Sequence, residues 1–378
     1  MAFSEDDSRR LDLLQALRGL AVLAVMLHHT LFYPLRGFQY CFHLADGAFD
    51  GGWIGVDAFF CLSGFVMAWV HGDDIGIPER ARSFAFKRFF RIYPPYLVFL
   101  LFTYLFLLVA SRALGLPPLH SPLDLLGSLF LLPPYDHLVI GVAWTLTHEA
   151  LFYALFCVAI LAGPRLAKAG AVGWTLGIVL FARPIAHAAM SVESDSPFVS
   201  FVFNPVNLEF LGGIVAAACV RRWRGAPQAF AWAALALCAT ILGIGYAHGT
   251  WHNFRGIRLP PDLVEKVALT VAFSGLLFGL VRLELDRVLR APAFLVALGT
   301  ASYSVYLLHE NVMRWIGYGT AALFPGLFSG AHPAAIQALL IGAFAATLGI
   351  SLAYYRTVEK PLLKRCRDWL KAEEKRSA

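Results

Sequence analysis

Long apolar runs dominate the chain, and most of them are long enough to cross a lipid bilayer. A transmembrane helix needs about 20 such residues, at a rise of about 1.5 Å each. The pattern therefore predicts an all-α polytopic membrane protein with about ten transmembrane helices. The expected spans cover about residues 11–32, 51–71, 92–111, 141–162, 169–190, 200–220, 227–247, 263–281, 293–316 and 334–356.

Two other segments complete the predicted organisation. Residues 123–133 are apolar but too short to cross, so they form a re-entrant or interfacial piece, with proline pairs at 117–118 and 133–134. After the last span, apolar residues repeat with helical spacing and basic residues fill the other face. This pattern predicts a helix on the inner membrane surface, as an anchor more than a functional element. We expect a transmembrane domain at 1–356 and a basic amphipathic cytoplasmic tail at 357–378.

Composition and charge agree with this class. The chain is 58% hydrophobic and 15% charged, whereas a soluble domain is about 45–50% apolar and 25% charged. Most of the 31 lysines and arginines fall in segments that are cytoplasmic if the N-terminus is cytoplasmic. Topology thus explains the net charge of +6 without a nucleic-acid partner, and both termini are expected inside. The polar start predicts no cleavable signal, so the first helix is retained.

The first span carries ionisable residues that a lipid-facing helix would exclude. Arg18 and His29 are eleven residues apart, which places them on one helix face within about 20° and about 16 Å apart along the axis. His28 points about 80° away, so His29 is the better candidate for the shared face. Such groups indicate function by default. The alternative is a snorkelling arginine with a histidine packed against neighbouring helices.

The fourth span contains a carboxylate, Glu149, about 12 Å below its outer end. It lies at a depth comparable to that of His29. We expect a His–Glu pair in which the carboxylate fixes the imidazole tautomer and stabilises the imidazolium after proton abstraction. His148 is an equal candidate partner for Glu149. A structural salt bridge between helices is the alternative.

A basic pair precedes the third span. Arg88 and Arg91 are three residues apart, so in a helix they share a face and suit a phosphate group, which guanidinium binds with two parallel hydrogen bonds. The alternative is the usual positive charge of an inner loop, or binding of lipid headgroups.

Further polar residues mark the outer ends of other spans. In Gly51–Phe65, glycines permit close helix approach and Asp57 lies level with His29, either as a site residue or as a partner of the helix dipole. In span nine, Ser302, Tyr306 and His309 form a stripe that lines a cavity, donates to an oxyanion, or joins helices. Asn204, Asn207 and Glu209 are weaker candidates. No zinc, disulfide, Walker or nucleophile-elbow spacing is visible, so no metal site is expected.

Taken in order, these segments resemble the membrane acyltransferase-3 family, which includes bacterial O-antigen, exopolysaccharide and Nod-factor O-acetyltransferases. The resemblance covers nearly the whole chain. Its elements are Arg18 with His29, Gly51–Phe65, Arg88–Pro94, Trp144–Tyr153, Glu209–Gly213, Ser302–His309 and Glu359–Pro361. Thr145 stands where many members have serine. No fused periplasmic hydrolase-like domain is expected.

The resemblance implies a bacterial inner-membrane enzyme that uses cytoplasmic acetyl-CoA and acylates a carbohydrate hydroxyl, or a lipid-linked sugar, reached from the outer side. Arg88 and Arg91 would hold the phosphates of the donor, and Arg18 would draw the donor inward or act in catalysis by steadying its thioester end. His29, backed by Glu149, would act as general base, with an acetyl-histidine intermediate as the alternative.

The remaining candidates are residues for substrate binding. They are Asp57, Ser63, Tyr303 and His309, of which the last three would stabilise the developing oxyanion. Two other functions stay open: transfer of another acyl group, such as succinyl, or to a lipid, and a transporter or flippase in which the buried charges form a substrate or proton path. A non-catalytic scaffold fits so many ionisable groups poorly. The oligomeric state is left open.

Overall fold

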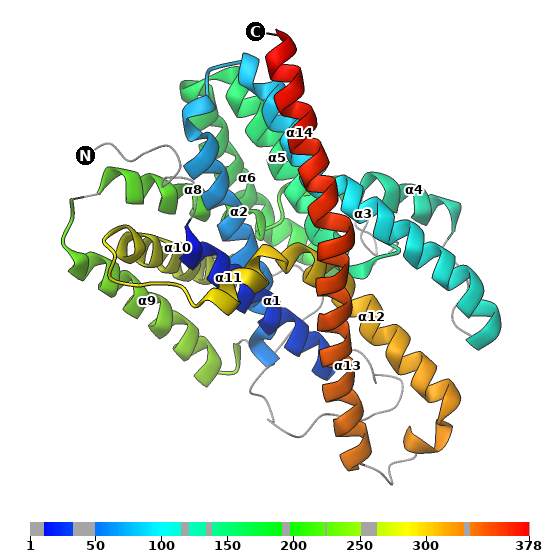
Figure 1. The fold of residues 1–378 in the computed structure, drawn as a ribbon. Helices are drawn as coiled ribbons and strands as arrows, with labels where there is room; N and C mark the ends of the chain where they lie inside the picture. The colour runs from blue at the N-terminus through cyan, green and yellow to red at the C-terminus, as the bar shows by residue number, and fades with distance from the viewer. Residues whose placement is uncertain are drawn as a thin grey trace. The chain divides into compact units, whose positions relative to one another are not determined.

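The computed structural model describes residues 11–32, 50–114, 121–133, 138–190, 197–223, 225–250, 263–328 and 333–377. Within these residues every regular element is helical and no strand occurs (Figure 1). Nine helical segments there are long and apolar enough to cross a membrane. The all-α polytopic fold is therefore confirmed. The start of the chain before residue 11, Pro117, Pro118 and Pro134 lie outside the described residues.

The helices follow the hydrophobic runs closely. In chain order they are α1 (Asp12–Phe32), η2 (Asp50–Ile54), α2 (Gly55–His71), η3 (Gly72–Asp74), α3 (Glu79–Leu114), α4 (Pro122–Phe130), η5 (Gly141–Ala143), α5 (Trp144–Ala162), α6 (Pro164–Met190), α7 (Pro197–Val202), α8 (Asn207–Arg222), α9 (Gln228–Ala247), α10 (Leu263–Leu285), α11 (Ala293–Thr300), α12 (Ser302–Leu323), η7 (Pro325–Phe328), α13 (Pro333–Tyr354), the π-turn η8 (Tyr355–Glu359) and α14 (Lys360–Ser377).

The region expected as the ninth span, about 293–316, is divided into α11 and α12. The break comes between Thr300 and Ser302. Neither piece is among the nine apolar segments. The reason lies in the sequence of α12, whose first three turns carry serine, tyrosine, histidine, glutamate and asparagine side chains, all buried.

The short apolar segment before the fourth span is the nine-residue helix α4, too short to cross, as predicted. A capping box starts it: Ser121 Oγ accepts from the amide of Asp124 at 3.2 Å, and the Asp124 carboxylate accepts from the amide of Ser121 at 2.8 Å. Its end is attached to α3, because the Tyr96 hydroxyl donates to the carbonyl of Ser128 at 2.7 Å.

The chain forms two compact units, and the division falls within α1, α3 and α5. The first unit comprises Met1–Val25, Asp50–Ala81 and Ala154–Thr300. In it α8 packs against both α2 and α10, and α9 packs against α10 (Figure 1). Small residues allow this: a Cβ on Gly64 would collide with the carbonyl of Phe210, so α2 and α8 touch backbone to backbone.

The second unit comprises Met26–Phe49, Arg82–Tyr153 and Ala301–Ala378. Its last three elements, α13, η8 and α14, follow one another without a break and form one long rod (Figure 1). The tail helix thus continues the line of the last span, and does not turn aside at the end of α13. Trp369 on α14 stacks on Phe86 of α3, with ring centroids 4.6 Å apart and planes 19° apart. The tail therefore packs on the start of α3.

Candidate functional site

His29 lies in the second unit and contacts a second histidine from α12. Its Nδ1 is 2.5 Å from Nε2 of His309, and the two rings are inclined by only 11° with centroids 4.8 Å apart. A neighbouring contact strengthens the junction, since the Thr30 hydroxyl lies 3.0 Å from the sulfur of Met313 and donates to the carbonyl of Met26. The end of α1 is thus held against α12 by two adjacent side chains.

His309 is completely buried and uses both ring nitrogens. Nδ1 is 2.6 Å from the carbonyl oxygen of Tyr306, and Nε2 meets His29. His309 was predicted to bind substrate or an oxyanion; in the structure its ring nitrogens contact His29 and a backbone carbonyl. Of the two adjacent histidines on α1, His28 is fully buried and His29 is half-buried. This difference favours His29 as the histidine that a substrate reaches.

Glu149 lies on α5 and is half-buried. Its Oε1 accepts a hydrogen bond from the hydroxyl of Tyr153 at 2.5 Å, one helical turn away. The ring of Tyr153 in turn lies 5.6 Å from the guanidinium of Arg88, which also lies 5.8 Å from the ring of Phe84. The sequence predicted a His29–Glu149 pair; the hydrogen bonds described here join His29 to His309 and Glu149 to Tyr153.

Arg91 shares the helix α3 with Arg88 and binds a different group. Its Nη1 is 3.2 Å from Oε1 of Glu359, a fully buried carboxylate at the end of the π-turn. The other oxygen of Glu359 accepts from the hydroxyl of Ser304 on α12 at 2.5 Å. The arginine also lies over the ring of Tyr303, at 5.8 Å. Glu359 therefore fixes Arg91, while α3, α12 and the π-turn meet at this point.

Tyr303 was predicted as an oxyanion donor, but its hydroxyl is already engaged. It is buried and donates to the carbonyl of Ile92 on α3 at 2.8 Å. A second tyrosine hydroxyl, that of Tyr354, donates to the carbonyl of Pro95 at 2.5 Å. The two bonds attach α3 to neighbouring helices near Pro94 and Pro95, and α3 continues through both prolines.

Asp57 lies in the first unit, where it forms an ion pair with Lys266 of α10. The Lys266 ammonium is also 3.4 Å from Oε1 of Glu209 on α8 and 5.2 Å from the ring centroid of Trp53. All three charged side chains are buried, with 5% exposure for Lys266 and 1% for Asp57. Asp57 was predicted to bind substrate; the structure shows it in an acid–base cluster that joins α2, α8 and α10.

Ser63 and Arg18, two further candidates, also lie in the first unit. Ser63 is half-buried on α2, and Arg18 is half-buried on α1, the helix that carries His29 in the other unit. The glycines of the same region behave as predicted: a Cβ on Gly55 would lie 2.5 Å from the carbonyl oxygen of Ala21. They serve close packing of α2.

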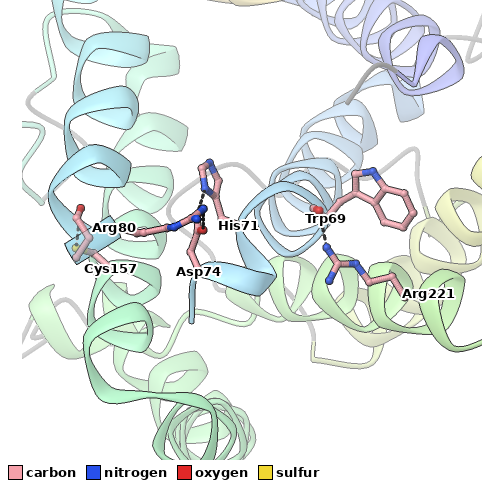
Figure 2. Close-up of polar contacts among 7 residues, drawn as sticks. Trp69, His71, Asp74, Arg80, Cys157 and Arg221 are labelled. Carbon is pink, nitrogen blue, oxygen red and sulfur yellow. Dashed lines mark hydrogen bonds and ion pairs between the residues drawn. The ribbon is translucent and has the colours of Figure 1, made fainter. Parts of the chain in front are cut away.

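The end of α2 carries a second polar network of the first unit (Figure 2). His71 Nδ1 lies 2.8 Å from Oδ2 of Asp74, and Arg80 Nη1 lies 2.8 Å from Oδ1 of the same carboxylate. On the other side of the turn, Arg221 donates to the carbonyl of Trp69 at 2.6 Å (Figure 2). Arg221 also pairs with Asp73 at 2.9 Å. These contacts close the tight turn between α2 and α3.

Three residues that make these contacts have either no role or a different role in the sequence prediction. Glu359 belongs to a motif whose chemistry the sequence does not reveal, Lys266 reads as an ordinary outer basic residue, and His309 reads as a substrate ligand. A buried acid in a membrane helix requires a cation or a proton, which is the signal that points from Glu209 and Asp57 to a lysine. Among the described residues no group of three or more histidine, cysteine, aspartate or glutamate side chains is placed to hold a metal ion.

Comparison with known proteins now decides the family. A family described as an acyltransferase domain matches residues 11–356. The chain belongs to this acyltransferase family. It is also similar to the exopolysaccharide production protein ExoZ of Rhizobium meliloti (strain 1021), with 31% identity over 339 residues, 86% of this chain and 95% of the relative. No solved structure matches the chain. The expected family is confirmed, and the protein is a multi-pass membrane acyltransferase.

Proposed function

We propose that the protein transfers an acetyl group from cytoplasmic acetyl-CoA to a hydroxyl group of an exopolysaccharide sugar or of its lipid-linked precursor. The acyltransferase family supports the reaction class, and the name of the relative, an exopolysaccharide production protein, supports the acceptor class. The observation that carries the proposal is the half-buried, hydrogen-bonded His29 at the end of a membrane helix, in the same unit as Arg88 and Arg91.

In the proposed reaction, Nε2 of His29 takes the proton of the acceptor hydroxyl as its oxygen attacks the thioester carbonyl carbon. The carbon–sulfur bond breaks, the acceptor oxygen keeps the acetyl group, and the CoA thiolate leaves and takes up the proton. A general base of this kind contributes about 10²- to 10⁴-fold. The alternative is attack by Nε2 itself to give an acetyl-histidine, followed by transfer to the hydroxyl. Glu149 supports the site from α5.

The arginine pair would hold the phosphates of the donor. Arg91 retains further N–H donors beyond the one near Glu359, because a guanidinium has five. Arg88 lies over the ring of Tyr153, the residue whose hydroxyl is bonded to Glu149. This arrangement requires the start of α3 to face the cytoplasm of the bacterial inner membrane. Both termini are then cytoplasmic as well.

The proposal is tested with purified protein and acetyl-CoA labelled in the acetyl group. We expect the label on the saccharide, released CoA in equal amount, and a loss of at least about 10²-fold in His29→Ala. His28→Ala is the matched control on the same helix. Succinyl-CoA in place of acetyl-CoA tests the donor. Saccharide movement across vesicles without CoA release would instead identify a flippase and overturn the proposal.

A further inference from the structure

The two histidines at the α1–α12 junction form a directed hydrogen-bond chain that ends on a backbone carbonyl. A carbonyl oxygen only accepts, so the Nδ1 of His309, 2.6 Å from the Tyr306 carbonyl, carries the proton of that bond. A neutral imidazole has one N–H, and Nε2 of His309 is then a bare acceptor. The contact with the Tyr306 carbonyl therefore fixes the tautomer of His309 independently of His29.

The tautomer of His29 follows from that of His309. The 2.5 Å contact between His29 Nδ1 and His309 Nε2 needs one proton, and only His29 is left to supply it. The ring geometry suits such a bond, because rings inclined by 11° whose centroids are 4.8 Å apart meet edge to edge in nearly a common plane. His29 therefore donates through Nδ1, and its Nε2 has no proton.

Burial favours the neutral state on which this chain depends. His309 is 0% exposed, and so is His28, whose ring lies 5.5 Å from that of His29. A charged imidazolium at His309 would be isolated from water, which is costly. The neutral chain from His29 through His309 to Tyr306 satisfies both nitrogens of His309.

We propose that His309 is a positioning residue that holds His29 as the Nδ1–H tautomer, so that Nε2 is the unprotonated ring nitrogen. This inference rests on the proposed function of His29 as base or nucleophile, and both mechanisms need the same unprotonated Nε2. His309 contributes through His29 and does not itself contact the acyl group. The neutral imidazole of His309 replaces the carboxylate that the sequence suggested for this place.

A pair of substitutions of similar size separates this role from simple packing. His309→Gln keeps a carbonyl acceptor near the place of Nε2, whereas His309→Leu fills the space without an acceptor. We expect kcat to fall about 10- to 100-fold in the leucine variant, the range for loss of a partner that orients a functional histidine. The KM for the acyl donor should stay unchanged, and the glutamine variant should recover most of kcat. Equal losses in the two variants would overturn the proposal.

A spectroscopic readout keeps the inference separable from the reaction itself. In full-length protein with ¹⁵N-labelled histidine, the His29 signals are assigned by their loss in His29→Gln. We expect an unprotonated Nε2 and a protonated Nδ1 in the wild type and in His309→Gln, and a mixture of tautomers in His309→Leu. A protonated Nε2 in the wild type would refute the role of His309 whatever the activity. Absence of acyl transfer with the expected tautomer would refute only the proposed function.

Discussion

Arg91 and Glu359 form an ion pair that joins α3 to the π-turn, with Nη1 of the arginine 3.2 Å from Oε1 of a carboxylate that has no exposed surface. The arginine side chain is 26% exposed, so the two partners are unequal in burial. Removal of the arginine isolates a buried charge, which costs more than the pair itself contributes. The two arginines of the family motif are therefore expected to behave differently when mutated.

The first prediction compares Arg91→Ala with Arg88→Ala. Loss of Arg91 should lower the free energy of unfolding by about 2–4 kcal/mol, because Glu359 is left buried without the arginine that neutralises it. Loss of Arg88 should chiefly raise the KM for the acyl donor, by about tenfold or more, since a charge-assisted contact to phosphate contributes about 1.5–3 kcal/mol. Thermal unfolding in detergent and donor titration measure the two effects. Equal stability of both variants would contradict the structural assignment of Arg91.

The second prediction concerns the buried cluster of Asp57, Glu209 and Lys266. Lys266→Met leaves two carboxylates without their cation and should destabilise the protein by about 3–5 kcal/mol. Adding Asp57→Asn to this variant removes one of the two charges and should restore part of the loss, a non-additivity that a double-mutant cycle measures. If Asp57 bound the acceptor, Asp57→Asn alone would raise the acceptor KM without any change in stability.

The hydrophobic pattern predicted the positions of the helices well, but it did not predict which side chains of different helices contact one another. Nine of the expected spans have the length and apolarity to cross a membrane, and α9 begins and ends within one residue of the expected 227–247. The start of α3 at Glu79 was missed, because residues 79–91 are rich in charge and precede the apolar run that predicted a span at 92–111. The helix also continues through Pro94 and Pro95, which normally end or kink a helix.

The candidate site shows the same limit. Helical spacing placed His29, Glu149 and His309 on polar helix faces. The spacing does not reveal which other helix packs against each of these faces. The partner of His29 comes from a position 280 residues away, and a pairing over that distance depends on how α1 and α12 pack. The same holds for Glu359, whose cation stands 268 residues earlier in the chain.

The third prediction tests the link between Tyr153 and Glu149. Tyr153→Phe keeps an aromatic ring under Arg88 and removes the hydroxyl that donates to the Glu149 carboxylate. We expect a moderate fall in kcat, about tenfold for the loss of a hydrogen bond to a charged group, with an unchanged donor KM. Glu149→Gln should reduce kcat further. A donor KM that rises in Tyr153→Phe would instead place the hydroxyl at the donor.

The fourth prediction concerns the tail helix. Trp369 stacks on Phe86, and an aromatic pair of this kind contributes about 0.5–1.5 kcal/mol beyond burial. Trp369→Ala should free α14 from α3 and expose the tail to limited proteolysis in detergent, whereas Trp369→Phe should keep it protected. Proteolysis at the same rate in both variants would show that the tail is not held by this ring contact.

The close backbone contact between Gly64 of α2 and Phe210 of α8, here called the glycine seam, has a consequence for turnover. Where Gly64 lies against the backbone of Phe210, no side chain separates α2 from α8, so neither helix can adjust at this point by changing a rotamer when the other shifts. The two helices must travel as one rigid body if the unit moves during a catalytic cycle. Conformational freedom in this unit is therefore to be sought at its turns, and a crosslink along the seam should leave the catalytic cycle intact.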